Sequence, residues 1–267
     1  MKIIITGATD GIGKQTALEL AQCGHQVFIH GRNNQRLTET KNWILDQVPK
    51  AEIQTFLADF ASLKDVAEFA NQLRSLNTSF DVLINNAGVI EKKLTYSADG
   101  FERTFAINHL APFYLTLLLL PHLKKQTSCK IINVASDAQA STIDFNALNA
   151  EKGYNTYDAY ALSKLCNVLF TFKLARELDK NQITVNALHP GVISTKILHA
   201  GWGMGGGSWH SGAATSVYLA TTSKEDQGSG HYYVNKQKAR ATAAAYDQKN
   251  QDLLWKKSLL MCKLKLS

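Results

Sequence analysis

Short apolar runs alternate with longer amphipathic runs along this 267-residue chain. The apolar runs are rich in β-branched side chains and predict strands at 2–6, 27–30, 53–58, 82–84, 130–134, 183–188 and 231–234. The amphipathic runs predict helices at 12–23, 37–48, 63–76, 99–123 and 157–179. Because strands and helices alternate, the pattern predicts an α/β fold with a doubly wound parallel sheet in a single domain.

The first strand runs directly into a glycine-rich turn that holds Gly7, Gly11 and Gly13. A helix that starts there presents unpaired N–H groups and a partial positive charge, which together bind a phosphate. Gly7 allows a sharp exit from the strand, Gly11 lets a ligand approach the main chain, and Gly13 allows close packing of helix and sheet. A glycine-rich turn can also be merely structural, but its place between a strand and a helix favours a dinucleotide site.

The residues after the second strand indicate which dinucleotide is bound. The carboxyl end of that strand should lie beside the adenosine ribose, and Arg32 is found there. An arginine suits a ribose 2′-phosphate, and no acidic residue for a 2′-hydroxyl occurs between Glu19 and Glu39. The sequence therefore predicts NADP(H) as the cofactor. Asp59, just past the third strand, is expected either to accept a hydrogen bond from the adenine amino group or to cap the helix after Ser62.

Two amide-bearing positions follow, one after the fourth strand and one within a predicted helix. Asn86, Ala87 and Gly88 come after the fourth strand, where a side-chain amide can hold neighbouring loops together and small residues leave room for a flat ring. We expect them to form a wall on the nicotinamide side, although the same residues also occur in generic turns. Asn108 lies on the apolar face of a helix that Pro112 is expected to interrupt, so it either caps a kink or serves a site.

A proton donor for carbonyl chemistry is predicted from three further residues. Ser136 lies just beyond the fifth strand, and Tyr160 and Lys164 are four residues apart on one helical face. Hydride transfer to a carbonyl carbon builds negative charge on its oxygen, so a proton donor must lie within hydrogen-bond reach. A tyrosine can be that donor, and an ammonium one turn away is expected to lower its pKa. Taken alone, the pair is also typical of a surface tyrosine beside a solvated lysine.

The last part of the chain contains a glycine-dense segment and a basic tail. Residues 201–212 read GWGMGGGSWHSG, and we expect a mobile substrate lid at about 194–212. Its apolar side chains favour a lipophilic substrate or simply pack the lid shut; they are Ile197, Leu198, Trp202, Met204 and Trp209. Residues 1–255 are expected to form the cofactor-binding domain. Residues 256–267 are expected to form a basic tail, which packs back on the domain in preference to an anionic membrane surface.

Composition argues against several other classes of protein. The net charge of +7 is mildly basic, but the lysines are scattered, so nucleic acid is not an expected partner. The four cysteines show no metal-ligand spacing, which predicts no metal and favours a reducing compartment. The longest apolar stretch, 115–120, is too short to span a bilayer. The first strand starts next to Met1 and leaves no room for a targeting peptide, so we expect a cytoplasmic protein without membrane contact.

Several motifs together resemble those of one enzyme family. They are Thr6-Gly7-Ala8-Thr9-Asp10-Gly11-Ile12-Gly13, Asn85-Asn86-Ala87-Gly88, Asn108 in FAINHL, Ser136, Tyr160-Ala161-Leu162-Ser163-Lys164 and Pro190-Gly191. With these motifs the chain resembles a short-chain dehydrogenase/reductase, close to the retinol-dehydrogenase-like branch, from residue 3 to about residue 255. The resemblance implies a Rossmann-type fold.

The same resemblance implies roles for the motif residues. Tyr160 would be the acid/base, and Ser136 would anchor the substrate oxygen. Lys164 would bind the nicotinamide ribose and tune Tyr160, and Asn108 would support a water relay to Lys164. The implied cofactor contacts are Gly7, Asp10, Gly11, Ile12, Gly13, Arg32, Asp59, Asn86, Ala87, Gly88, Tyr160, Lys164, Pro190, Gly191, Val192 and Thr195.

The function expected from this sequence is an NADP(H)-dependent oxidoreductase that interconverts a lipophilic aldehyde or ketone and an alcohol. The alternative is a protein on the same scaffold that binds NADP(H) as a sensor without turnover. The partner of the expected oxidoreductase would be a small carbonyl or alcohol substrate. By analogy with related enzymes, a homodimer or homotetramer is expected to pair through the helices at 99–123 and 157–179.

Overall fold

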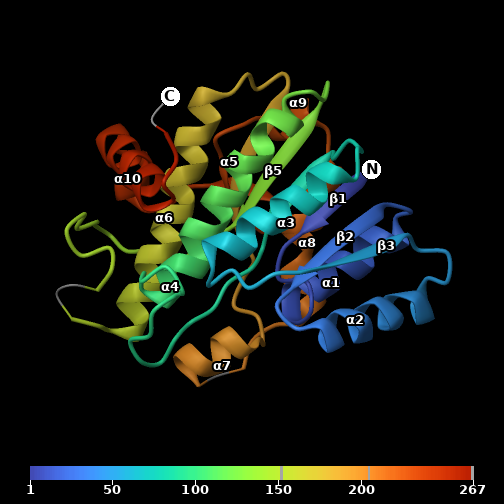
Figure 1. Ribbon diagram of the computed structural model, residues 1–267, viewed down its shortest axis with the longest axis horizontal. Coiled ribbons are helices and arrows are strands. Elements are labelled where there is room, and N and C mark those ends of the chain that lie inside the picture. The colour runs from blue at the N-terminus through green and yellow to red at the C-terminus, as the bar shows by residue number, and fades with distance from the viewer. Residues whose placement is uncertain (151–152, 204, 266–267) are drawn as a thin grey trace.

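The computed structural model describes residues 1–150, 153–203 and 205–265 around one eight-stranded sheet (Figure 1). The strand order is β3-β2-β1-β4-β5-β6-β7-β8, and neighbouring strands are parallel from β3 to β7. The predicted doubly wound parallel sheet is therefore confirmed. The strands are β1 (Lys2–Ile5), β2 (Gln26–Gly31), β3 (Ile53–Leu57), β4 (Val82–Asn85), β5 (Cys129–Val134), β6 (Ile183–His189), β7 (Tyr232–Val234) and β8 (Gln237–Ala239).

The edge strand β8 was not predicted. It pairs antiparallel with β7 through a two-residue turn, in which Asn235 and Lys236 both have positive φ angles of 48° and 65°. Two positive φ angles make a type I′ turn, which matches the twist of a hairpin. The Asn-Lys dipeptide lacks the glycine that usually marks such a turn in sequence.

Helices cover both faces of the sheet (Figure 1). One face packs against α3 (Leu63–Ser75), α5 (Ala111–Leu123) and α6 (Thr156–Glu177), and the other packs against α1 (Gly11–Gln22), α2 (Asn34–Gln47) and α8 (Trp209–Thr221). Alternate residues of β1 serve the two cores, since Ile4 enters the first and Ile3 and Ile5 enter the second. The shorter helices are α4 (Arg103–Phe105), α7 (Lys196–Trp202), α9 (Lys224–Gln227) and a 3₁₀ turn at Ala243–Tyr246.

The predicted helix at 99–123 begins at Arg103 and changes geometry in the middle. Residues Ala106–Leu110 form a π-helical turn between α4 and α5. Pro112 has no N–H to donate to the carbonyl of Asn108, four residues earlier, so the α-helical hydrogen-bond pattern is interrupted there. Among the described residues, Arg103–Leu123 is long and apolar enough to cross a membrane, but 72% of its most apolar part is buried inside the molecule, as in a core helix.

The glycine-dense segment expected to be a lid divides into two different structures. Residues 196–202 form α7, whereas residues 209–212 are the first turn of α8. A Cβ on Gly212 would lie 2.8 Å from Ile193 and 2.9 Å from Ile12, so this glycine lets α8 pack closely on α1. The segment 209–212 therefore belongs to the helical layer, and of the described residues in 196–212 those that border the cavity described below lie in α7. Met204 lies outside the described residues.

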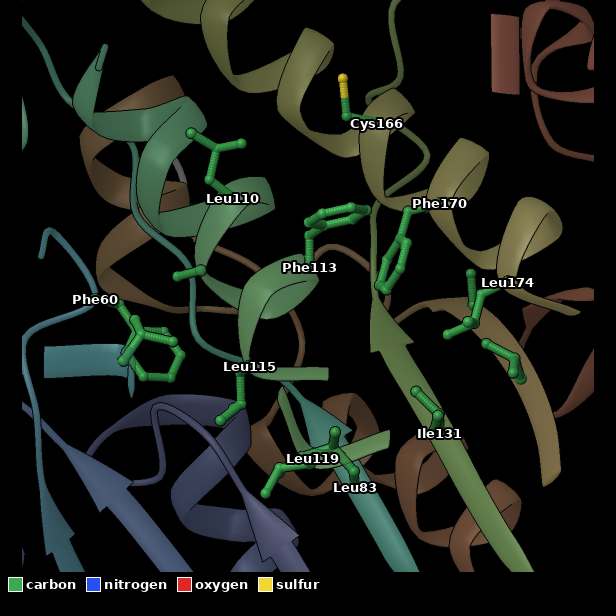
Figure 2. Packing of buried hydrophobic residues seen from close by; sticks show 14 of the residues in the cluster. Phe60, Leu83, Leu110, Phe113, Leu115, Leu119, Ile131, Cys166, Phe170 and Leu174 are labelled. Atoms are coloured by element: carbon green, nitrogen blue, oxygen red, sulfur yellow. The ribbon is translucent and has the colours of Figure 1, made fainter. Parts of the chain in front are cut away.

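The C-terminal residues form a helix, α10 (Gln248–Met261), so the predicted domain boundary after residue 255 falls inside this helix. Its Trp255 contacts the rings of Phe113 on α5 and Phe170 on α6, with centroid distances of 5.2 and 6.1 Å. Figure 2 shows Phe113 and Phe170 pointing toward one another. Leu254 and Leu259 are also buried, and hence residues 256–261 pack on the domain.

Candidate active site

A cavity of about 760 Å³ lies at the carboxyl ends of β1, β2, β4, β5 and β6. This is the edge at which ligands bind in open α/β sheets, and the volume is typical of a ligand site. All of the predicted cofactor and catalytic residues line it except Asn108. The motifs that are scattered over nearly two hundred residues of sequence are thus brought together.

The glycine turn forms one end of the cavity. Gly7 has a φ angle of +64°, and a Cβ there would lie 2.7 Å from the backbone of Ala87, so no other residue fits without a shift. Gly11 has a φ angle of +52°, and a Cβ there would lie 3.2 Å from the Thr195 side chain, so a larger residue would crowd Thr195. Asp10 caps α1 by accepting a hydrogen bond from the Gly11 N–H, and it forms an ion pair with Lys196 of α7. The carboxylate in the turn is therefore already engaged by the chain itself.

Asn86 holds the glycine turn against the neighbouring strand end. Its side-chain amide donates to the carbonyl oxygens of Thr6 and Gly7, at 2.9 and 3.0 Å. The Thr6 hydroxyl in turn accepts from the backbone N–H groups of Asn86 and Ala87, each at 3.0 Å. The expectation that amides tie neighbouring loops together is met at this position.

His30 also positions the glycine turn, a role that was not predicted from the sequence. Its Nδ1 accepts from the Gly7 N–H at 3.2 Å, and its Nε2 lies 3.0 Å from the carbonyl oxygen of Ala58. These two contacts require the neutral ring with its proton on Nε2. Burial lowers the pKa of His30 to about 4, which favours the same neutral form. The one sequence feature that could have indicated this role is the position of a histidine at the end of an apolar strand.

The adenosine end of the cavity carries two arginines, Arg32 and Arg36. Asn33 caps α2 by accepting from the Arg36 N–H at 2.9 Å, which places the first turn of α2 beside the cavity. Arg36 was missed in the sequence, although a spacing of four residues from Arg32 is a recognisable signal. Asp59 lines the cavity and accepts from the Ala61 N–H at 3.0 Å, whereas Ser62 itself caps α3.

Tyr160 and Lys164 lie side by side at the inner wall. Tyr160 is 7% exposed and Lys164 is 3% exposed. The Lys164 Nζ lies 5.5 Å from the centre of the Tyr160 ring and donates to the carbonyl oxygen of Val134 at 3.0 Å. Burial lowers the pKa of Lys164 to about 8, because an ammonium loses its hydration there.

The pKa of Tyr160 differs from the sequence-based expectation. Burial raises it to about 12, and a hydrogen bond with the Ser136 hydroxyl opposes this shift without cancelling it. The expected lowering by Lys164 does not appear, since desolvation of the phenolate is the largest effect. Tyr160 is therefore held in its protonated form in the free protein.

Ser136 is held by contacts from three parts of the chain. Its hydroxyl accepts from the Ala138 N–H at 3.1 Å, and its carbonyl oxygen accepts from the Tyr232 hydroxyl at 2.8 Å. Gln139 donates to the same carbonyl at 2.6 Å. His189 fixes the next residue, because its Nδ1 accepts from the backbone N–H of Asp137 at 3.1 Å. Tyr232 and Gln139 were not predicted, since nothing local in their sequence marks them.

Asn108 lies behind the cavity wall and is fully buried. Its side chain accepts from the Val89 N–H at 2.8 Å and donates to the Val89 carbonyl and to the Ser163 hydroxyl, each at 2.9 Å. A Cβ on Gly88 would lie 3.5 Å from both the Asn108 Oδ1 and the Lys164 Nζ, so the two side chains approach each other across this glycine. The observed role of Asn108 is to hold the loop after β4 next to Lys164, and the water relay stays a prediction.

The outer end of the cavity is aromatic and apolar. Trp202 of α7 and Tyr157 of α6 line it together with Ile90 and Leu198. Trp209 does not line it, and its indole N–H donates to the carbonyl oxygen of Ser194 at 2.7 Å. Of the five apolar side chains named in the predicted lid, Ile197, Leu198 and Trp202 border the cavity.

Comparison with known proteins identifies this constellation. The family model described as short chain dehydrogenase matches residues 1–202. The chain belongs to the short-chain dehydrogenase family. Retinol dehydrogenase 13 from Homo sapiens is 39% identical over 275 residues, which cover 96% of this chain and 82% of that protein. Polyprenol dehydrogenase from Homo sapiens is 33% identical over 279 residues, which cover 97% of this chain and 84% of that protein.

A solved structure supports the fold over the whole chain of this short-chain dehydrogenase. An uncharacterized protein from Mycobacterium paratuberculosis superposes with a TM-score of 0.82 at 27% sequence identity, covering 100% of this chain and 94% of that one. The chain is thus a retinol-dehydrogenase-like oxidoreductase with a Rossmann-type fold, as predicted.

The cavity fits the nicotinamide dinucleotide that this family uses. Gly7 in the turn after β1 and Gly11 at the start of α1 leave the backbone without side chains, and an added Cβ would lie 2.7 Å from the Ala87 backbone at Gly7 and 3.2 Å from Thr195 at Gly11. Ile12 and Gly13 are in the first turn of α1, whose N–H groups lack acceptors within the helix. Such a turn binds a pyrophosphate through its main chain.

Proposed function

We propose that this short-chain dehydrogenase uses NADP(H) to interconvert a lipophilic aldehyde or ketone and the corresponding alcohol. The observation that carries the proposal is the approach of Ser136, Tyr160 and Lys164 at one point of the cavity wall, each nearly buried. A protonated tyrosine in hydrogen-bond reach of a serine hydroxyl is suited to hold and protonate a carbonyl oxygen.

When bound, the nicotinamide cofactor supplies a hydride to the carbonyl carbon or accepts one from the alcohol. In reduction, the hydroxyls of Ser136 and Tyr160 hold the substrate oxygen, and Tyr160 donates its proton to it. The Lys164 ammonium then stabilises the phenolate that remains, and it is also placed to bind the cofactor ribose. Asn108 holds the loop after β4 in place beside Lys164.

The preference for NADP(H) over NAD(H) is supported by charge at the adenosine end. Arg32 and Arg36 both line the cavity there. An arginine binds a phosphate through charge-assisted hydrogen bonds, which are stronger than neutral ones. A ribose 2′-phosphate would therefore gain more from this surface than a 2′-hydroxyl.

An assay of the purified chain tests the proposed function against the sensor alternative. NADPH and NADH are each mixed with a panel of aldehydes, ketones and quinones, and loss of the reduced cofactor is followed by absorbance. We expect turnover with NADPH on apolar carbonyl compounds. Tight cofactor binding without turnover on any compound would favour the sensor. The cytoplasmic location and the homodimer or homotetramer stay predictions.

A further inference from the structure

The Trp202 ring stands directly against the ring of Tyr160. The two rings meet edge to face, with a centroid distance of 5.6 Å and an interplanar angle of 84°. Trp202 makes a second contact of this kind with Tyr157, at 6.0 Å and 88°. Because these distances are those of rings in van der Waals contact, little space remains between Trp202 and Tyr160 on this side.

The position of Trp202 is fixed by the packing of α7. A Cβ on Gly201 would lie 2.8 Å from the Ile90 Cδ1, so the last turn of α7 rests on the loop after β4. At its other end, α7 is joined to the glycine turn by the ion pair between Lys196 and Asp10. The helix that carries Trp202 is therefore held at both ends, although the Trp202 side chain lines the cavity and is 38% exposed.

Among the described residues next to Trp202 at this outer end, the side chains are apolar or already paired. Ile90 and Leu198 are apolar, and the Glu91 carboxylate is paired with Arg103 at 3.0 Å. Substrates are therefore selected at this end by how their carbon substituents fit against the Trp202 ring. A carbonyl oxygen bound at Tyr160 leaves two substituents on its carbon, and one of them must lie on the Trp202 side.

We propose that Trp202 is a specificity-determining residue whose ring excludes a second carbon substituent next to the reacting carbonyl. This inference rests on the proposed function. An aldehyde carries only hydrogen on that side, whereas a ketone carries an alkyl group. An aldehyde gains a hydride at carbon from the reduced cofactor and a proton at oxygen from Tyr160, and it leaves as a primary alcohol. The enzyme is thus selective for aldehydes and primary alcohols.

The test compares octanal with 2-octanone, which differ in the position of the carbonyl on the same straight chain. The ratio of their kcat/KM values is measured with NADPH for the unchanged protein, Trp202→Ala and Trp202→Phe. Trp43→Ala is the matched control, since Trp43 lies on α2 beneath Lys14 and does not line the cavity. Aldehydes are intrinsically more reactive than ketones, but this difference is the same for every variant. It therefore cancels when the ratios of the variants are compared.

We expect Trp202→Ala to shift the ratio toward 2-octanone by about tenfold or more, because one methylene in a tight pocket changes kcat/KM by about 10–200-fold. Trp202→Phe should shift it less, and Trp43→Ala should leave it unchanged. If Trp202→Ala does not fold, Trp202→Phe alone decides: a shift of the ratio toward 2-octanone supports the proposal, and an unchanged ratio overturns it. Turnover of both compounds with the same ratio in all variants overturns the role of Trp202 while leaving the proposed function intact. Absence of any turnover by the unchanged protein overturns both.

Discussion

The Lys164 ammonium is hydrogen-bonded to the carbonyl oxygen of Val134, 3.0 Å away at the end of β5. This contact directs the cation to the strand end and leaves it 5.5 Å from the centre of the Tyr160 ring. Because burial lowers the pKa of Lys164 to about 8 and raises that of Tyr160 to about 12, the lysine is the group of the pair that titrates first as pH rises.

The pH dependence of reduction should therefore follow Lys164. Below pH 8 the lysine is charged and Tyr160 keeps its proton, so both are in the state that reduction requires. Above about pH 8, kcat/KM for aldehyde reduction should fall by about tenfold per pH unit as the ammonium is lost. Steady-state rates from pH 6 to 10 measure this limb. A Lys164→Met variant should be slow and should lack the limb near pH 8, whereas an unchanged limb in that variant would assign it to another group.

Removing the Tyr160 hydroxyl should abolish most of the turnover. Tyr160→Phe keeps the buried ring and its contact with Trp202 but has no proton to give, so kcat should fall by about 10²–10⁴-fold. The affinity for NADPH, measured by fluorescence titration, should barely change. Tyr96→Phe is the control, since Tyr96 is exposed and does not line the cavity. Near-normal turnover in folded Tyr160→Phe would move the proton donor elsewhere.

The choice of cofactor should depend on Arg32 and Arg36. A charge-assisted hydrogen bond contributes about 1.5–3 kcal/mol, so Arg32→Asp should weaken NADPH binding by roughly one to two decades. NADH binding should change much less because it has no 2′-phosphate. Arg36→Ala should weaken NADPH binding in the same direction, and isothermal titration of both cofactors measures each effect. Equal affinity of the unchanged protein for NADPH and NADH would contradict the assignment.

The features that could be predicted from the sequence are those that depend on short, contiguous segments of the chain. The glycine turn, the Tyr160–Lys164 spacing and the position of Ser136 after a strand all follow from local pattern and strand order, and the structure brings them to one cavity. The start of α8 was hidden because its first turn lies in a glycine-dense stretch, although Ser208 is the kind of residue that caps a helix.

Contacts between distant segments could not be predicted in this way. Tyr232 reaches the Ser136 carbonyl across 96 residues of sequence, and His30 joins Gly7 to Ala58 by two hydrogen bonds. Each pairing depends on which strands become neighbours and on side-chain direction. The raised pKa of Tyr160 was missed for the same reason, since the depth of burial is a property of the packed molecule.

The docking of α10 on the domain should contribute to stability. Leu254 is 1% exposed on the face of α10 that packs toward α6, whereas Leu260 is 65% exposed. Leu254→Ala should lower the free energy of unfolding by about 2–5 kcal/mol because it leaves a cavity in the core. Leu260→Ala should change it by less than about 0.5 kcal/mol. Urea unfolding followed by tryptophan fluorescence measures both.

Deleting residues 248–267 should have a further effect, because it uncovers Phe113 and Phe170 on α5 and α6, the two helices through which pairing is expected. Burial of exposed aromatic surface favours association, so the shortened chain should form larger species than the full chain. Light scattering after size-exclusion chromatography gives the two molar masses. If the full chain is already a dimer through this face, α10 must be displaced in it, and Trp255 fluorescence should then change on dilution. If both proteins contain the same number of chains per particle and Trp255 fluorescence does not change, α10 does not control this surface.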